Sequence, residues 1–117
     1  MAGKDLIDLL LEIRAEKQRY LADVWKYVGL MKELVRGRDP KARVLLFGSF
    51  VKGVMRPDSD VDVLIITDEA ETVEKRIGLR VELLRAIGDV TPFEIHLVTQ
   101  SEYDEWYRRF IDRYVEV

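Results

Sequence analysis

The sequence contains no cysteine and only one histidine, His96, and these absences exclude several kinds of site. Without cysteine the chain forms neither a disulfide nor a thiolate metal site, and a single histidine cannot complete a closed zinc site. Long apolar runs are missing as well, because no segment approaches the roughly 20 apolar residues that cross a membrane. The N-terminal residues carry no apolar signal core, so we expect a cytoplasmic protein.

Asparagine is also absent, and glutamine occurs only at Gln18 and Gln100, whereas glutamate, lysine, arginine and valine are abundant. This usage is typical of proteins from hot environments and carries no information about activity. A length of 117 residues is enough for one core but not for two, which predicts a single domain.

An excess of basic residues is also missing. The chain has 19 lysines and arginines and 22 aspartates and glutamates, which gives a net charge of -3. Proteins that hold a long nucleic acid usually carry a positive net charge or a basic stripe. This chain shows neither, so a nucleic acid is disfavoured as its substrate. A small molecule or another protein remains as the expected acceptor or partner.

The most informative segment that is present reads LLFGSFVKGVMRPDSDVDVLII. Within it, Gly48 and Ser49 end one apolar run, and Asp60 and Asp62 begin a second run after ten intervening residues. In a strand, the i, i+2 spacing places both carboxylates on one face, roughly 7 Å apart. Two such anions at the edge of a core are costly unless a cation binds them, and carboxylates suit hard ions such as Mg²⁺. The alternative roles are a strand cap for Asp60 and a chance acid at Asp62.

The Gly-Ser turn offers backbone N–H groups and a hydroxyl that suit a phosphate. Lys52 and Arg56 are close enough in the chain to neutralise phosphate charge, and each is explained equally well as an ordinary surface cation. Asp58 and Ser59 are expected to shape the turn that precedes the acidic pair.

Apolar periodicity and turn residues predict an α/β fold in which a small mixed sheet packs against helices. The expected strands span residues 43–47, 61–67 and 93–98. The expected helices span 50–54, 68–87 and 99–117, after a long N-terminal helical segment over 1–36 that is either one helix or two helices meeting near residues 16–19. Residues 43–98 form the expected core region of the single domain.

Three of the helical segments carry apolar residues at helical spacing, which predicts the faces that they bury. In the N-terminal segment a second apolar flank leaves open whether it packs on the domain or on a partner subunit. Thr99 and Glu102 predict a capping box at the start of the last helix, and Gly88 suits the end of the preceding one. The expected core faces are Leu6, Leu10, Ile13, Tyr20, Val24, Val28, Met31 and Val35; then Ala70, Val73, Ile77, Val81, Leu84 and Ile87; and finally Tyr103, Trp106, Tyr107 and Phe110.

The strand over 93–98 alternates between apolar and polar side chains. Phe93, Ile95 and Leu97 share one face, and Glu94 and His96 share the other. A strand histidine is more often structural than functional, although on this face it is able to lie behind bound metal ions or to hydrogen-bond an acceptor.

The pattern Gly-Ser, ten residues, Asp-x-Asp, with an apolar strand on each side, resembles the nucleotidyltransferases of the DNA polymerase beta superfamily. It is most similar to the minimal nucleotidyltransferase (MNT) proteins, which are often encoded beside a helical HEPN partner. The resemblance extends over residues 43–98 and implies a nucleotidyltransferase fold. It also implies transfer of a nucleoside monophosphate, AMP from ATP, to a hydroxyl acceptor.

By the same resemblance, Asp60, Asp62 and Glu94 are the catalytic carboxylates that hold two Mg²⁺ ions. Glu94 takes this role because the neighbouring strand supplies a third carboxylate in the family. The resemblance also implies a binding site for the phosphates of the nucleoside triphosphate, formed by Gly48, Ser49, Lys52 and Arg56.

Larger relatives carry further domains, so the resemblance implies that a second protein, a HEPN-type toxin that is neutralised by adenylylation, completes the site. Two rival hypotheses stay open. One is a binding module of the same fold that inhibits such a partner by contact without catalysis. The other is an enzyme that modifies small molecules, with a pocket formed by a homodimer.

Overall fold

The computed structural model describes residues 3, 5–56 and 59–117, and Asp58 therefore lies outside the described residues. None of the described helices is both long and apolar enough to span a membrane. The strands are β1 (Arg43–Phe47), β2 (Val61–Ile66), β3 (Phe93–Val98) and β4 (Tyr114–Glu116). The helices and helical turns are α1 (Leu6–Leu21), α2 (Val24–Arg38), α3 (Ser49–Lys52), η1 (Asp68–Ala70), α4 (Val73–Ile87), α5 (Gln100–Glu102), η2 (Tyr103–Tyr107) and α6 (Arg108–Phe110).

The four strands form one mixed sheet in the order β3-β2-β1-β4. Strand β1 runs antiparallel to both β2 and β4, whereas β2 and β3 are parallel. The α/β class and the small mixed sheet predicted from the sequence are thereby confirmed. In the register, Asp62 lies opposite Phe47 on one side and Glu94 on the other. This pairing brings the two predicted carboxylates of neighbouring strands to the same end of the sheet.

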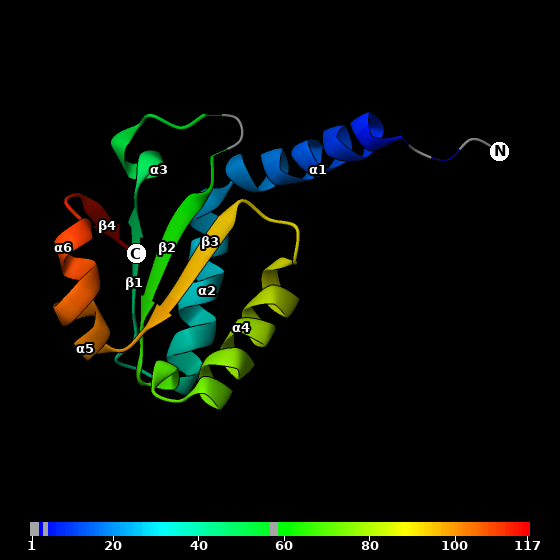
Figure 1. Cartoon of the computed structure of the whole chain (residues 1–117). Helices are drawn as coiled ribbons and strands as arrows, with labels where there is room; N and C mark the ends of the chain where they lie inside the picture. The colour runs from blue at the N-terminus through cyan, green and yellow to red at the C-terminus, as the bar shows by residue number, and fades with distance from the viewer. Residues whose placement is uncertain (1–2, 4, 57–58) are drawn as a thin grey trace.

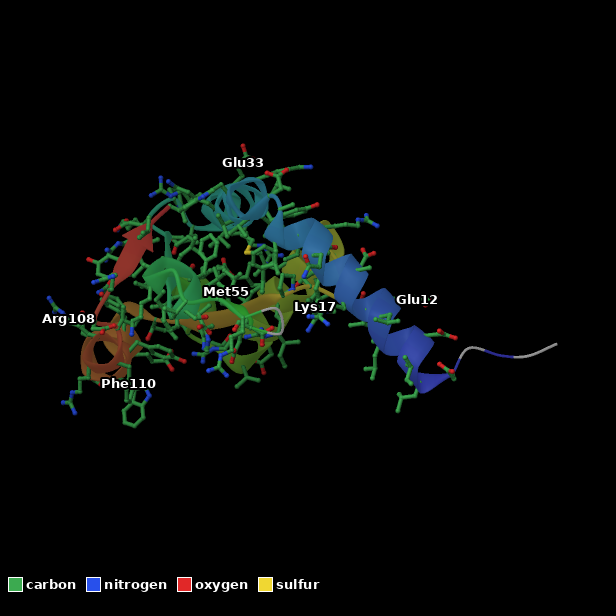
Figure 2. All side chains as sticks on the ribbon, turned by 90° about the horizontal axis from the view of Figure 1, so that it is seen from above. Glu12, Lys17, Glu33, Met55, Arg108 and Phe110 are labelled. Atoms are coloured by element: carbon green, nitrogen blue, oxygen red, sulfur yellow. The ribbon has the colours of Figure 1, made fainter. Side chains whose placement is uncertain are left out.

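Helices cover both faces of the sheet, as Figure 1 shows. Helices α2 and α4 pack on one face, over a core that contains Val44, Val63 and Ile95. The other face is covered by residues 100–110, which we call the C-terminal helical segment; Leu64 and Val98 of the sheet are buried together with Tyr103 of this segment. Because side chains alternate along a strand, Asp62, Glu94 and His96 belong to this second face.

The N-terminal segment forms two helices rather than one, and they meet at residues 22–23, beyond the predicted junction. Helix α2 buries Val24, Val28, Met31 and Val35 as predicted, but α1 buries none of its residues. The expected core positions Leu6 and Leu10 are exposed. Both figures show the reason, because α1 projects away from the body of the molecule.

The predicted face of α4 was wrong over most of its length. Val73, Ile77, Val81 and Leu84 are exposed, whereas Ile87 is buried as expected. The helix carries a second apolar stripe, and contact with the sheet and α2 selects that stripe for burial. It consists of Leu79 and Leu83 with Ile87. The break before α4, at the N-cap residue Thr72, also separates the expected helix over 68–87 into η1 and α4.

The C-terminal part agrees with the prediction at its start and departs from it at its end. The capping box of Thr99 and Glu102 is present, but the helix expected over 99–117 ends at Phe110 and is followed by β4. Within the expected aromatic core face, Tyr103 is buried whereas Trp106 and Phe110 are exposed. Strand β4 forms by pairing with β1, which is distant in the chain. A segment of three residues is too short for its own sequence pattern to predict this strand.

Candidate active site

Three side chains from two adjacent strands converge at the end of the sheet. Asp62 lies on β2, and Glu94 and His96 lie on β3. One carboxylate oxygen from each acid and one ring nitrogen of His96 all lie within 4.8 Å of one another. The parallel register explains the meeting, since it sets Asp62 directly beside Glu94 and orients both toward one face. Asp62 and Glu94 are therefore neighbours, as their assignment to one carboxylate cluster requires.

The surroundings of Asp62 oppose its negative charge. Burial raises the pKa of the Asp62 carboxyl, and the neighbouring Glu94 carboxylate raises it further, while His96 acts in the opposite direction. The side chain is one-quarter exposed, so solvent reaches it from one side only. A cation placed between the two carboxylates removes this repulsion and favours their ionised forms.

The Gly-Ser turn touches the same carboxylate. Gly48 has a φ of 77°, in the left-handed region that favours glycine. A Cβ atom at Gly48 would overlap Oδ2 of Asp62 and lie 3.2 Å from its Cγ. Glycine at this position thus lets the backbone of the turn approach Asp62, so the turn lies directly beside this carboxylate.

Of the other predicted phosphate-binding residues, Ser49 and Lys52 have side-chain partners within the protein, and Arg56 makes a contact through its backbone. The Ser49 hydroxyl donates to the sulfur of Met55 at 3.3 Å. Lys52 pairs with Asp112, with 3.2 Å between Nζ and Oδ1, and this ion pair lowers the pKa of the Asp112 carboxyl. Arg56 is exposed, and its backbone N–H donates to the Ser59 hydroxyl. A phosphate at the turn would therefore meet backbone N–H groups first.

Asp60 precedes β2 and is exposed. Its carboxylate is not one of the three groups that meet within 4.8 Å among the described residues; His96 completes that set instead. The i, i+2 spacing does not place its side chain, because Asp60 lies before the first residue of β2. The structure thus brings together Asp62, Glu94 and His96 and leaves Asp60 exposed, two residues before Asp62 in the chain.

His96 is held between the acids and an aromatic wall. Its Nε2 is buried and has no hydrogen-bond partner among the described residues, at 3.6 Å from Asp62 Oδ1 and 3.8 Å from Glu94 Oε1. Its Nδ1 lies 3.5 Å from the Tyr107 hydroxyl, and the rings of Phe47 and Tyr107 pack against it. Sequence reasoning gave His96 a place on the correct face but missed Tyr107 and Phe47, because neither lies near it in the chain.

The donor set at this position fits a divalent cation. It offers two carboxylates and an imidazole nitrogen, which are common ligands of divalent metals. An unpartnered buried nitrogen beside two mutually repelling acids is the arrangement that a cation satisfies. Asp62, Glu94 and His96 are the residues that could hold such an ion.

Comparison with known proteins gives one family and several relatives. The profile of the nucleotidyltransferase domain family matches residues 26–114, which is most of the chain and contains every site residue discussed above. A spectinomycin 9-adenylyltransferase from Campylobacter jejuni is 32% identical over 83 residues, which cover 56% of this chain and 32% of that protein. The chain thus spans about a third of the length of this curated relative.

Solved structures agree with the fold. The crystal structure of a provisionally assigned nucleotidyltransferase, 28% identical, superposes with a TM-score of 0.66 over 77% of this chain and 96% of its own. A second such protein, from Sulfolobus solfataricus, is 19% identical and superposes with a TM-score of 0.56 over 98% of this chain and 87% of its own. At that identity the second likeness concerns the fold alone.

Proposed function

This chain belongs to the nucleotidyltransferase domain family, and from that membership we propose that it transfers a nucleoside monophosphate, AMP from ATP, to a hydroxyl acceptor. The acceptor oxygen forms a bond to the α-phosphorus while the bond from that phosphorus to the bridging oxygen of the β-phosphate breaks. Pyrophosphate leaves, and the hydroxyl proton passes to Glu94. The observation that supports this proposal best is the meeting of Asp62, Glu94 and the Gly48 turn at one point.

Each part of the site has a role in this proposal. The turn at Gly48 and Ser49 binds the β- and γ-phosphates through backbone N–H groups and the Ser49 hydroxyl. Lys52 and Arg56 neutralise phosphate charge, for which Lys52 must exchange its contact with Asp112 for one with the nucleotide. That exchange is inexpensive because both partners of the ion pair are largely exposed. The residues act mainly by positioning and by charge, as phosphoryl-transfer sites commonly do.

We assign the cation binding to Asp60, Asp62 and Glu94, with two Mg²⁺ ions as the family resemblance implies. Such ions, when bound, neutralise phosphate oxygens and favour the ionised form of an attacking hydroxyl. The three carboxylates supply the negative charge that holds them; burial, and then the Glu94 carboxylate, raise the pKa of Asp62, and a bound cation would oppose both effects.

The acceptor is, in this proposal, a hydroxyl on a partner protein of the HEPN type, so that the chain acts as an antitoxin in the cytoplasm and as one domain. The N-terminal half of α1 supports a protein partner, because Leu6, Ile7, Leu10 and Leu11 are each more than half exposed. An apolar surface of this kind commonly marks a site of protein interaction. A second copy of this chain is the alternative occupant.

Labelled ATP tests the reaction directly. The purified chain is incubated with ATP labelled at the α-phosphate, Mg²⁺ and a co-expressed HEPN-type partner, and label transfer to the partner is measured. The proposal expects transfer by the wild type and at least about a hundredfold loss in the double variant Asp60→Ala with Asp62→Ala. Transfer that persists in the double variant contradicts the assigned mechanism.

The competing function is inhibition of the partner by contact alone, and the exposed apolar half of α1 is the observation that favours it. Inhibition that survives Asp60→Ala with Asp62→Ala, but not Leu6→Ser with Leu10→Ser, would support this alternative. The matched control is Val73→Ser with Ile77→Ser, which changes equally exposed apolar residues on α4. Light scattering of the same variants determines whether α1 instead joins two copies of this chain.

A further inference from the structure

We propose that Nε2 of His96 is a metal ligand and that the site consequently prefers a first-row transition cation, such as Mn²⁺, to Mg²⁺. The inference rests on the proposed function, because it concerns the cation of the same site. It departs from an all-carboxylate site in naming a nitrogen ligand and in the ion that this ligand selects.

The separations around Nε2 leave room for an ion. The distances of 3.6 Å to Asp62 Oδ1 and 3.8 Å to Glu94 Oε1 exceed those of an N–H to O hydrogen bond. Two adjacent ligands that each lie about 2.1 Å from one metal ion are themselves about 3.0 Å apart in octahedral geometry and about 3.4 Å apart in tetrahedral geometry. Nε2 of His96 therefore lies beyond hydrogen-bond distance of both carboxylate oxygens and slightly farther from them than two ligands of a common cation lie from each other.

Burial makes an empty partner position costly. Nε2 is shielded from solvent and has no hydrogen-bond partner among the described residues. A buried polar atom left unsatisfied costs roughly 1–3 kcal/mol, and native proteins rarely keep one without a purpose. In the proposed arrangement the imidazole is neutral and the lone pair of Nε2 points toward the two carboxylates. A cation between them would then be bound by the lone pair and by both negative charges.

The far side of the ring is arranged as in histidines that bind metals. Nδ1 faces the Tyr107 hydroxyl at 3.5 Å, and in the proposed arrangement the ring proton is on Nδ1, which leaves Nε2 as the electron-pair donor. Phe47 and Tyr107 pack on the ring with centroid separations of 5.6 Å and 5.8 Å. These contacts come from β1 and the C-terminal helical segment, and they hold the imidazole in one orientation toward Asp62.

The ligand chemistry then decides the choice of ion. Mg²⁺ is a hard cation that takes oxygen ligands and retains its water molecules, whereas imidazole nitrogen suits the later first-row transition metals best, and Mn²⁺, which also takes carboxylate ligands, binds it more readily than Mg²⁺ does. Two carboxylates alone would not discriminate strongly between these ions. The addition of His96 gives the transition cation an advantage that Mg²⁺ does not share. The competing arrangement is an imidazolium ion that pairs with both carboxylates and binds no metal.

Spectroscopy on the full chain with Mn²⁺ alone separates the two arrangements. His96 is the only histidine, so in protein prepared without a histidine tag any imidazole nitrogen coupled to bound Mn²⁺ comes from this residue. Pulsed electron paramagnetic resonance is expected to show that coupling in the wild type and to lose it in His96→Gln. Mn²⁺ bound without the coupling would overturn the inference, and so would the absence of Mn²⁺ binding at millimolar concentration.

Calorimetry supplies a second measurement that does not depend on activity. In His96→Gln the Mn²⁺ affinity is expected to fall at least about tenfold, while the Mg²⁺ affinity changes much less. Equal losses for both ions, or none for either, would overturn the inference. Asp62→Asn serves as the reference because it should weaken both ions. Mn²⁺ binding that requires Asp62 but not His96 would leave the proposed transferase function standing and remove only the role of His96.

Discussion

A partly or fully buried carboxylate lies near each end of β2, and the two differ in the groups that surround them. Asp39 lies at the end where β2 is followed by Thr67, and its oxygens accept from Thr67 Oγ1 at 2.8 Å and from the N–H groups of Lys41 and Asp68 at 3.0 Å each. Asp62, near the start of the strand, faces Glu94 and the unpartnered Nε2 of His96 instead.

The titration behaviour follows from this difference. Burial disfavours the Asp39 carboxylate, but the hydrogen bonds from Asp68, Thr67 and Lys41 outweigh it, and the pKa of Asp39 is lowered. Burial and Glu94 together raise the pKa of Asp62. A buried carboxylate that accepts several hydrogen bonds stabilises the fold. A carboxylate that faces another carboxylate is instead typical of a site that binds a cation or another ligand. The comparison assigns Asp39 to the stability of the fold and agrees with the proposal that Asp62 acts in the site.

The largest effect that follows from the comparison is on activity. Asp62→Asn is expected to lower nucleotidyl transfer by about 100- to 1000-fold, because it removes a charge from the site. The free energy of unfolding should stay the same or rise, since the substitution also removes repulsion with Glu94. Transfer assays and thermal unfolding of one preparation give both quantities. A loss of stability of several kcal/mol would show that Asp62 is structural after all.

The converse substitution is Asp39→Ala, which should destabilise the protein by about 2–4 kcal/mol. The reason is that the Thr67 hydroxyl and the Asp68 N–H lose the acceptor of their hydrogen bonds. Transfer per folded molecule should be unchanged. Urea unfolding measures the first quantity. Asp89→Ala is a suitable control, since Asp89 is exposed and its removal should cost little. If Asp39→Ala also abolishes transfer in the folded protein, the two ends are not separate.

Gly48→Ala should destabilise the protein by about 1–3 kcal/mol, through backbone strain and through contact with Asp62. Gly53→Ala reports the milder strain of the left-handed helical region, because Gly53 has φ 71° and ψ 23° and an added Cβ there meets no atom within 4 Å. Gly48 has φ 77° and ψ -154°, a region that glycine almost alone adopts, so Gly48→Ala should cost more even without the contact. The contact itself is measured by a double-mutant cycle, in which the cost of Gly48→Ala should fall when Asp62 is replaced by glycine. A cost of Gly48→Ala that is the same in both backgrounds would argue against the Gly48 to Asp62 contact.

The smallest effect is on the pH dependence of stability. Because the folded-state pKa of Asp39 lies below its unfolded value of about 3.9, its contribution to stability is present above that pH and is lost as the pH falls toward the folded-state pKa. Denaturant unfolding between acidic and neutral pH should show a smaller acid-induced loss in Asp39→Asn than in the wild type. Identical profiles would mean that the carboxylate is not specially stabilised in the folded state.

Local signals in the sequence predicted much of the fold and part of the site. Strands β1 and β3 have the predicted bounds, and β2 ends one residue earlier than expected. The capping box of Thr99 and Glu102 is present, as is the terminating Gly88. The alternation of apolar and polar residues in β3 is enough by itself to place Glu94 and His96 on one face. These features depend on patterns within a few residues, which is why a single sequence is enough to see them.

Other features required contacts between distant segments. Helix α4 carries two apolar stripes, and only its packing against α2 and the sheet decides that Leu79 and Leu83 are buried while Val73 and Ile77 are not. Strand β4 is three residues long and exists only because β1 accepts it as a neighbour. The local sequence pattern predicts neither the buried face of α4 nor the strand β4, because other arrangements fit the same pattern equally well.

The sequence by itself thus determined the nature of this protein: its α/β class, its Gly-Ser and Asp-x-Asp motif and, through them, its family. The tertiary structure alone decided that Gly48 touches Asp62, that His96 rather than Asp60 completes the cluster with Glu94, and that Tyr107 stands behind the imidazole. The physical reason is the range of the interactions. Strand alternation and helix caps act over a few residues, whereas a site is assembled by register and packing between segments that meet only when the chain has folded.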